Sequence, residues 1–273
     1  MSHVVTLLNQ KGGVGKTSTA YHLAGTLARS GRSVLLIDND PQASLTQGFW
    51  GPQAMREIEA AASVAALFDP GQFAIPEALI RPTGLDRVAI VPGSRHLTPA
   101  NMRPPSEWGE AERGIRDLVD EVRGDYEVVL IDCPPNLHLC SWAALVASDS
   151  IVVPLQAEDF GSQGLAPVQE AIAAVQAGPN PSLRLAGYLL TMFDKRLTVH
   201  LAYEAMLREM YGSAVFAASF PRAKDFVEAV ASRQPIAQYK PRSAAAKVTQ
   251  AVADELLSRL AGSVDARPEG VAA

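Results

Sequence analysis

Two lysines bracket a glycine-rich turn near the start of the chain, and their spacing suits phosphate binding. The stretch reads Lys11, Gly12, Gly13, Val14, Gly15, Lys16, Thr17, Ser18. In a turn that leads from a strand into a helix, backbone N–H groups converge, the helix dipole favours an anion, and a lysine adds a full positive charge. The stretch therefore predicts a cradle for the phosphates of a nucleotide.

The turn departs from the usual phosphate-loop pattern, G-x-x-x-x-G-K-[ST], at one position. Counting back from Lys16, the place of the first glycine is held by Gln10, and Lys11 follows it. On the residues alone, an ordinary glycine-rich turn with chance lysines is the alternative. The strand-and-helix context on either side favours the phosphate site.

Carboxylates stand at the ends of two further apolar runs. Asp38 and Asp40 end the run that starts at Ser33, and Asp132 ends the run that starts at Glu127. In an open parallel sheet, residues at the carboxyl ends of strands project into the ligand crevice. An Asx-rich turn before a helix and a plain strand end are the alternatives for these positions.

Apolar runs and helical patterns alternate along most of the chain. This predicts a single-domain α/β fold over residues 1–262, a doubly wound, mostly parallel sheet flanked by helices. The last residues, 263–273, are low in apolar content and predicted to be disordered. Strands are expected at 4–8, 33–38, 88–91, 127–132, 150–154 and 183–192. Helices are expected at 16–30, 106–123, 139–147, 161–177, 198–210 and 243–260.

Composition limits the classes of function. No apolar run approaches the ~18 residues of a membrane span. Two cysteines cannot form a disulfide framework, and the five histidines lack ligand spacing. A cytoplasmic protein is therefore expected. The net charge is −5, but residues 184–247 hold ten Lys/Arg against five Asp/Glu. This basic segment hints at a polyanion-binding face, although a mixed solvated surface explains it equally well.

The motifs together resemble the ParA/MinD family of P-loop ATPases with a deviant Walker A motif, whose signature residue is the first lysine. Asp38-Asn39-Asp40-Pro41-Gln42 is similar to the second motif of ParA, and the run ending at Asp132 resembles a Walker B strand. The resemblance covers Val4 to about Leu260. It implies ATP and Mg²⁺ as cofactors and an ATP-dependent homodimer.

The resemblance also implies roles for single residues. Lys16 would bridge toward the γ-phosphate, Lys11 would reach into the partner's site, and Asp40 would orient the attacking water. Thr17 would bind the metal ion directly, and Asp132 would bind it through a water molecule. Asp38 would lie behind these ligands without touching the ion. The phosphates would be held by residues 11–18.

This sequence resembles the family less closely at the loop that contacts adenine and at the residues that bind DNA. The resemblance implies that Pro221 and Ala223 contact adenine, with Ala223 standing where an amide side chain is usual in the family. Arg196 matches the first of two DNA-binding arginines, and the second position is Asp225. The residues predicted to bind DNA are Arg196, Arg222, Lys224, Lys240 and Arg242.

The expected function is DNA partitioning, of a plasmid or a chromosome. ATP-bound dimers would bind double-stranded DNA without sequence preference on the nucleoid, and a ParB-like centromere-binding partner would stimulate hydrolysis and release them. One alternative keeps the ATPase but changes the cargo to a carboxysome, a chemoreceptor cluster or a cellulose-synthesis complex. A MinD-like membrane regulator and a nitrogenase-iron-protein-like reductase fit less well, because the end of the chain lacks a basic amphipathic helix and Cys133 and Cys140 resemble core residues.

Overall fold

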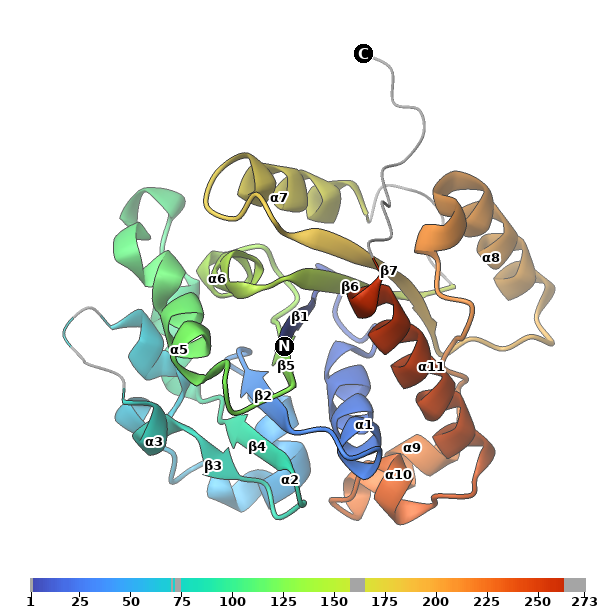
Figure 1. The fold of residues 1–273 in the computed structure, drawn as a ribbon, viewed down its shortest axis with the longest axis horizontal. Coiled ribbons are helices and arrows are strands. Elements are labelled where there is room, and N and C mark those ends of the chain that lie inside the picture. Colours follow the sequence, from blue (N-terminus) through green and yellow to red (C-terminus); the bar gives the residue numbers. More distant parts are fainter. Residues whose placement is uncertain (1, 70, 72–74, 158–164, 263–273) are drawn as a thin grey trace.

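A seven-stranded sheet lies at the centre of the computed structural model, which describes residues 2–69, 71, 75–157 and 165–262. The strand order is β3-β4-β2-β5-β1-β6-β7. Every pairing is parallel except that of the short edge strand β3 with β4. The predicted doubly wound, mostly parallel sheet is confirmed (Figure 1). The strands are β1 (His3–Leu7), β2 (Val34–Asp38), β3 (Arg81–Pro82), β4 (Val88–Val91), β5 (Val128–Asp132), β6 (Ser150–Gln156) and β7 (Arg184–Thr191).

Helices cover both faces of the sheet. One face packs against α1 and α11, and the other against α5, α6, α7 and α8. The helices are α1 (Lys16–Arg29), α2 (Ser44–Ala54), α3 (Pro76–Leu79), α4 (Thr98–Asn101), α5 (Gly114–Val122), α6 (Leu139–Ala147), α7 (Ala166–Ala177), α8 (Thr198–Tyr211), α9 (Lys224–Ala231), α10 (Ile236–Tyr239) and α11 (Ala244–Ala261). No helix in the described part of the chain is long and apolar enough to span a membrane.

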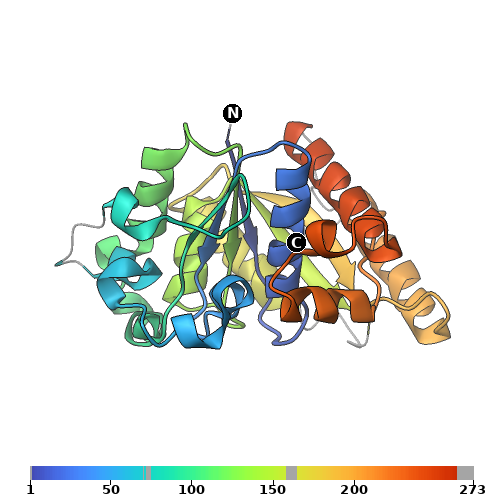
Figure 2. The same ribbon diagram turned by 90° about the horizontal axis from the view of Figure 1, so that it is seen from below.

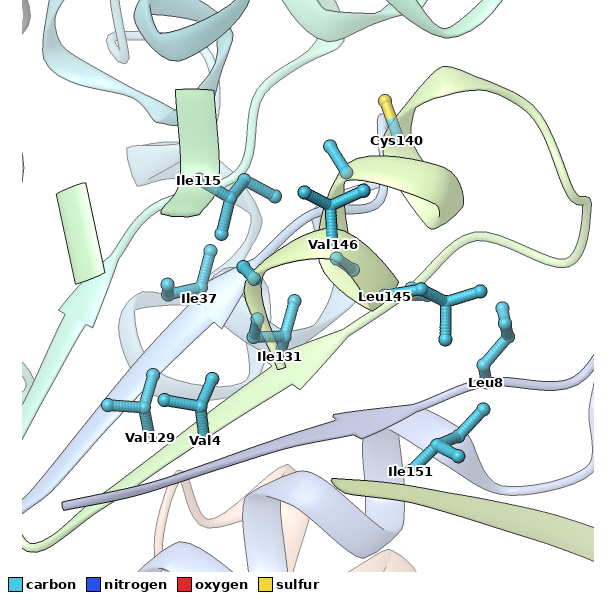
Figure 3. Packing of buried hydrophobic residues seen from close by; sticks show 14 of the residues in the cluster. Val4, Leu8, Ile37, Ile115, Val129, Ile131, Cys140, Leu145, Val146 and Ile151 are labelled. Atoms are coloured by element: carbon cyan, nitrogen blue, oxygen red, sulfur yellow. The ribbon is translucent and has the colours of Figure 1, made fainter. Parts of the chain in front are cut away.

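Successive side chains of the central strands point alternately into the two hydrophobic cores, one on each face of the sheet. Val4 joins the cluster on the α6 face, whereas its neighbour Val5 joins the cluster on the α1 face. The same alternation places Ile37 on the first face and Leu36 on the second, because successive side chains of a strand point to opposite faces. Figure 3 shows the first cluster, in which Val4 and Ile37 lie beneath Val146 of α6. Both faces are buried, which is why most residues of these strands are apolar.

Two expected helices differ from the structure. The helix predicted over 106–123 is wrong in its first half, where short 3₁₀ turns replace it and α5 begins only at Gly114. Gly109, at φ 49°, takes a left-handed conformation that interrupts a helix. The helix predicted over 161–177 begins at Ala166, and 161–164 lie outside the described residues, as does the predicted disordered tail 263–273.

The two ends of the chain meet around α1. The imidazole Nδ1 of His22 accepts the N–H of Ile236 at 3.1 Å, and the Gln238 amide donates to the Gly25 carbonyl at 2.9 Å. A Cβ on Gly25 would lie 2.3 Å from the Cβ of Pro235, so the Pro235 ring packs against the α1 backbone in space that only a glycine leaves. Figures 1 and 2 both show α9, α10 and α11 grouped beside α1.

Candidate nucleotide site

The phosphate loop joins β1 to α1 and has the geometry that the sequence predicts. Gly13 and Gly15 have φ values of 77° and 85°, which residues with a Cβ rarely adopt, and Gly15 is the residue that caps α1. Two neighbouring strands hold the loop from outside. The Thr191 hydroxyl lies 2.8 Å from the Val14 carbonyl, and the Gln156 amide donates to the Gly13 carbonyl at 2.9 Å. The loop is thus fixed to β6 and β7.

Lys16 lies inside this loop. Its ammonium group donates to the carbonyls of Asn9 at 3.0 Å and Lys11 at 3.2 Å, and the residue is only 6% exposed. Burial lowers the pKa of Lys16, and the negative charge of Asp132 opposes that change. Two carbonyl oxygens thus hold the ammonium group on the inner side of the loop.

Asn9 determines where Lys11 stands. The Asn9 side chain accepts the backbone N–H of Lys11 at 2.9 Å and donates to the Pro154 carbonyl on β6 at 2.8 Å. Lys11 itself is exposed at the mouth of the loop. The first lysine of the motif is thus anchored by its backbone and presented to the outside, whereas Lys16 is turned inward.

Two carboxylates lie side by side beneath the loop. Asp38 and Asp132 are register partners on β2 and β5, and both are fully buried. One oxygen of Asp38 accepts the N–H and the hydroxyl of Thr46, at 2.7 and 2.6 Å. The other oxygen of Asp38 and both oxygens of Asp132 have no hydrogen-bond partner in the part of the chain that the structure describes.

The electrostatics of this acid pair follow from burial. Desolvation raises the pKa of Asp38 to about 7, and the bonds from Thr46 limit the rise. Desolvation, followed by the charge of Asp38, raises the pKa of Asp132 well above its usual value, and the adjacent Thr17 hydroxyl opposes this rise. Unpartnered carboxylate oxygens of this kind suit a bound cation or its water ligands.

No group of three or more His, Cys, Asp or Glu side chains in residues 2–69, 71, 75–157 and 165–262 could hold a metal ion unaided. The residues that are present nevertheless fit Mg²⁺, which keeps several waters and takes further oxygens from phosphate groups. Thr17 could supply a hydroxyl, and Asp132 could accept from a metal-bound water. The structure thus fits a metal site that is complete only with a nucleotide.

Asp40 follows β2 on a turn beside these acids. It is half-buried, and one of its oxygens accepts the N–H of Gln42 at 2.8 Å. Its charge contributes to the pKa changes of both Lys16 and Asp132, so it lies within electrostatic reach of them. Thr46, held by Asp38, lies in the first turn of α2 and connects this turn to the Gly93 N–H at 2.9 Å. Asp38 therefore anchors the segment that carries Asp40.

A cavity of about 290 Å³ opens beside Gly15 and continues away from the phosphate loop. Its walls come from the end of β7, from the 220–223 loop and from α9, and they are mainly apolar. Pro221 and Ala223, the predicted base contacts, both line it. The loop is held by backbone bonds from Phe220 to Leu190 and from Phe193 to Phe220, each 2.9 Å long.

Several of the residues predicted to bind DNA are paired with carboxylates, and Arg222 lines the cavity beside Gly15. Arg196 is held by Asp194 through two side-chain bonds of 2.9 and 2.7 Å. Lys240 contacts both Asp225 and Glu228, at 2.8 and 2.6 Å. Lys224 lies 3.8 Å from Glu228, and Arg222 and Arg242 are exposed. Pairing reduces the positive charge that this surface presents.

Four residues that position the site escaped the sequence analysis: Asn9, Thr46, Gln156 and Thr191. Each one acts by bonding to the backbone or to a buried acid across the sheet. Asn9 and Thr191 lie directly after or at the end of an apolar run, which is the one pattern that could have indicated them.

Comparisons with known proteins agree with this geometry. A family model described as an AAA domain matches residues 2–185. The chain is 37% identical to the chromosome-partitioning ATPase Soj of Thermus thermophilus, covering 94% of this chain and 96% of the relative. It is 32% identical to the sporulation initiation inhibitor protein Soj of Bacillus subtilis, covering 94% and 98%.

Solved structures show the same fold. The cobyrinic acid a,c-diamide synthase of Mycobacterium smegmatis, with a bound ATP analogue and magnesium, superposes with a TM-score of 0.78 at 28% identity over 96% of this chain and 97% of that one. An ATP complex of Cyanothece McdA gives 0.79 at 18% identity over 95% and 96%. From its deviant phosphate loop, its sheet and these relatives, the chain belongs to the ParA/Soj family of P-loop ATPases.

Proposed function

We propose that this protein is an ATP-driven partitioning switch that alternates between an ATP-bound homodimer on DNA and a released form. The observation that carries the proposal is the pair of lysines at the phosphate loop. Lys16 is buried and faces inward, whereas Lys11 is exposed and its backbone is fixed by Asn9. A second lysine presented outward suits contact with the phosphates of a partner's nucleotide across a two-fold axis.

The residues of the site divide the work of phosphoryl transfer to water. The loop N–H groups and Lys16 hold the phosphates, and Asp40 orients the attacking water. Bound Mg²⁺ would neutralise charge that develops on the phosphate oxygens, and Thr17 and Asp132 are the residues that would hold it. Asp38 keeps the Asp40 turn in place through Thr46. Slow hydrolysis by the chain alone, accelerated by a ParB-like protein, completes the proposed cycle.

The proposed DNA interaction rests on the 184–247 segment. Phosphate contacts dominate non-specific binding, so the summed charge of the face matters more than any single arginine. Similarity to the Soj protein described as a chromosome-partitioning ATPase supports DNA as the cargo and the nucleoid as the location. A protein assembly as cargo, carried by the same ATPase cycle, is the second candidate.

The test is DNA binding measured with ATP, with ADP and without nucleotide, over a range of salt. The proposal predicts ATP-dependent binding without sequence preference that weakens steeply with salt. The same measurement with anionic liposomes separates this function from a MinD-like one. ATP-dependent binding to liposomes, and none to DNA, would contradict the proposal.

Two variants test the roles of single residues. Asp40→Ala is expected to keep ATP-dependent dimerisation and DNA binding but to lose about 10²–10⁴-fold in hydrolysis, the usual contribution of a positioned acid or base. Lys11→Ala is expected to remain a monomer with ATP in size-exclusion chromatography. Lys247→Ala, which removes an exposed lysine on α11, is the matched control. A normal ATP dimer of Lys11→Ala would refute the cross-site role.

A further inference from the structure

Asn39 is a fully buried amide that stands between the acids of the site. Its N–H donates to the Asp132 carbonyl at 2.9 Å, so the ladder between β2 and β5 continues one residue past the end of β2. The side chain is 0% exposed, and its amide donates to the Cys140 carbonyl on α6 at 2.6 Å. Figure 3 shows Ile37 of β2 and Cys140 on this same face of the sheet. A buried amide among apolar side chains costs free energy unless its hydrogen bonds serve the structure or the function.

The bond to α6 joins the two segments that carry the acids. Cys140 lies in the first turn of α6, the helix that follows Asp132 in the chain. The Ser141 hydroxyl donates to the Asn136 carbonyl at 2.6 Å, which ties this helix to the 133–138 loop. Asn39 therefore holds the end of β2 twice, to β5 through its backbone and to the helix after β5 through its side chain. The ends of the two acid-bearing strands are thus fixed relative to each other.

The turn that carries Asp40 depends on attachments at its ends. One Asp40 oxygen accepts the N–H of Gln42 at 2.8 Å, a bond that shapes the turn without attaching it to the rest of the fold. On the side of α2, Asp38 accepts the N–H and the hydroxyl of Thr46. On the side of α6, the attachment is the amide of Asn39. Without that amide, side chains would hold the turn from the α2 side alone.

A second buried side chain attaches α6 to the sheet in the same way but away from the acids. The Thr6 hydroxyl on β1 lies 3.2 Å from the Ala144 carbonyl and 2.6 Å from the Ser148 hydroxyl. Thr6 is also 0% exposed. Both Thr6 and Asn39 thus connect a strand to a carbonyl of α6, and only Asn39 adjoins Asp40. Comparing the two separates an effect on Asp40 from the general attachment of this helix.

We propose that Asn39 is a positioning residue for ATP hydrolysis, which holds Asp40 at the place where it orients the attacking water. The inference rests on the proposed function, because that function supplies the role of Asp40. The phosphates are held by the loop and Lys16, so loss of the Asn39 amide should lower kcat and leave ATP binding unchanged. A misplacement of about 1 Å costs about 10²-fold in rate, so a loss of about 10–100-fold in kcat is expected.

Two variants of the full chain test this role. Asn39→Leu keeps the approximate size of the side chain, and Asn39→Ala shortens it, so a packing defect in one variant does not affect the other. Hydrolysis is followed with Mg²⁺ as the release of phosphate from ATP labelled at its γ-position. The dissociation constant for ATP is measured by filter binding, and the ATP-dependent dimer by size-exclusion chromatography. Both variants should lose kcat and keep the affinity for ATP and the dimer, the pattern of an interaction that is needed only in the transition state.

The control is Thr6→Val, which removes the other buried bond to α6 and keeps the shape of the side chain. It should leave kcat unchanged. A wild-type kcat in both Asn39 variants would overturn the inference, and so would an equal loss of kcat in Thr6→Val, because the effect would then come from the attachment of α6. A loss of ATP affinity that matches the loss of kcat would also overturn it. If the wild type itself hydrolyses no ATP, the proposed function fails together with the inference.

Discussion

Asp38→Asn is expected to stabilise the nucleotide-free protein, and to do so increasingly as the pH rises. Asp38 is fully buried, and its pKa rises from 3.8 to about 7 because burial disfavours the charged form. A carboxyl group with a raised pKa stabilises the fold while it is protonated. Its contribution is therefore lost as the pH rises from about 4 through 7. Asparagine keeps the shape and the acceptor for Thr46 but removes the charge.

The size of the effect follows from the shift. Each pKa unit corresponds to about 1.36 kcal/mol, so the full cost of ionising Asp38 in the fold is about 4 kcal/mol above pH 7. Between pH 5 and pH 8 the advantage of the variant should grow by about 2–3 kcal/mol. The charge of Asp38 also raises the pKa of Asp132. Removing that charge makes Asp132 easier to ionise in the fold, which stabilises the variant further.

Urea unfolding at pH 5, 6, 7 and 8, without nucleotide or divalent ions, measures this difference. The control is Asp86→Asn, because the Asp86 side chain is 95% exposed and its neutralisation should give a flat profile. Parallel stability curves for the wild type and Asp38→Asn across this range would refute the argument. They would show that the acid is ionised in the fold at no cost.

Three further outcomes are expected. Leu36→Ala, at a fully buried position of β2, should lower the free energy of unfolding by about 2–5 kcal/mol in chemical denaturation. Asn9→Ala should cost about 1–3 kcal/mol of stability by leaving the Pro154 carbonyl unpaired, and should weaken ATP-dependent dimerisation in size-exclusion chromatography. Asp225→Lys should free Lys240 from one of its two acidic partners and tighten DNA binding severalfold in a filter-binding assay; unchanged affinity would separate this face from DNA.

Most of the fold could be predicted from the sequence, because its strands are buried on both faces. The run 127–132 has an uninterrupted apolar centre, 128–131, and its predicted start differs from that of β5 by one residue. The phosphate loop was equally predictable, because its lysines and glycines act through local geometry. Asn9 and Gln156 were not predictable, since each gains its role only when β6 lies beside β1.

The fold also brings together residues whose contact could not be predicted from their distance in the sequence. Trp108 and Trp142 lie far apart in sequence, yet their ring centroids are 5.4 Å apart, and the Trp142 indole donates to Glu112 at 2.9 Å. The pairing of Lys240 with Asp225 and Glu228 is similar, because it joins the segment after α10 to α9. Charge counts along the chain therefore overstated the positive field of this surface.

The contact of α1 with α10 has a consequence for how the protein is made. A ribosome releases the phosphate loop first, but α1 also packs against residues more than 200 positions later in the chain. Domains commonly fold as units once their chain has emerged. The packing of α1 is therefore complete only after Ile236 and Gln238 have left the exit tunnel. A stalled or truncated product that ends before α10 would lack these contacts on α1.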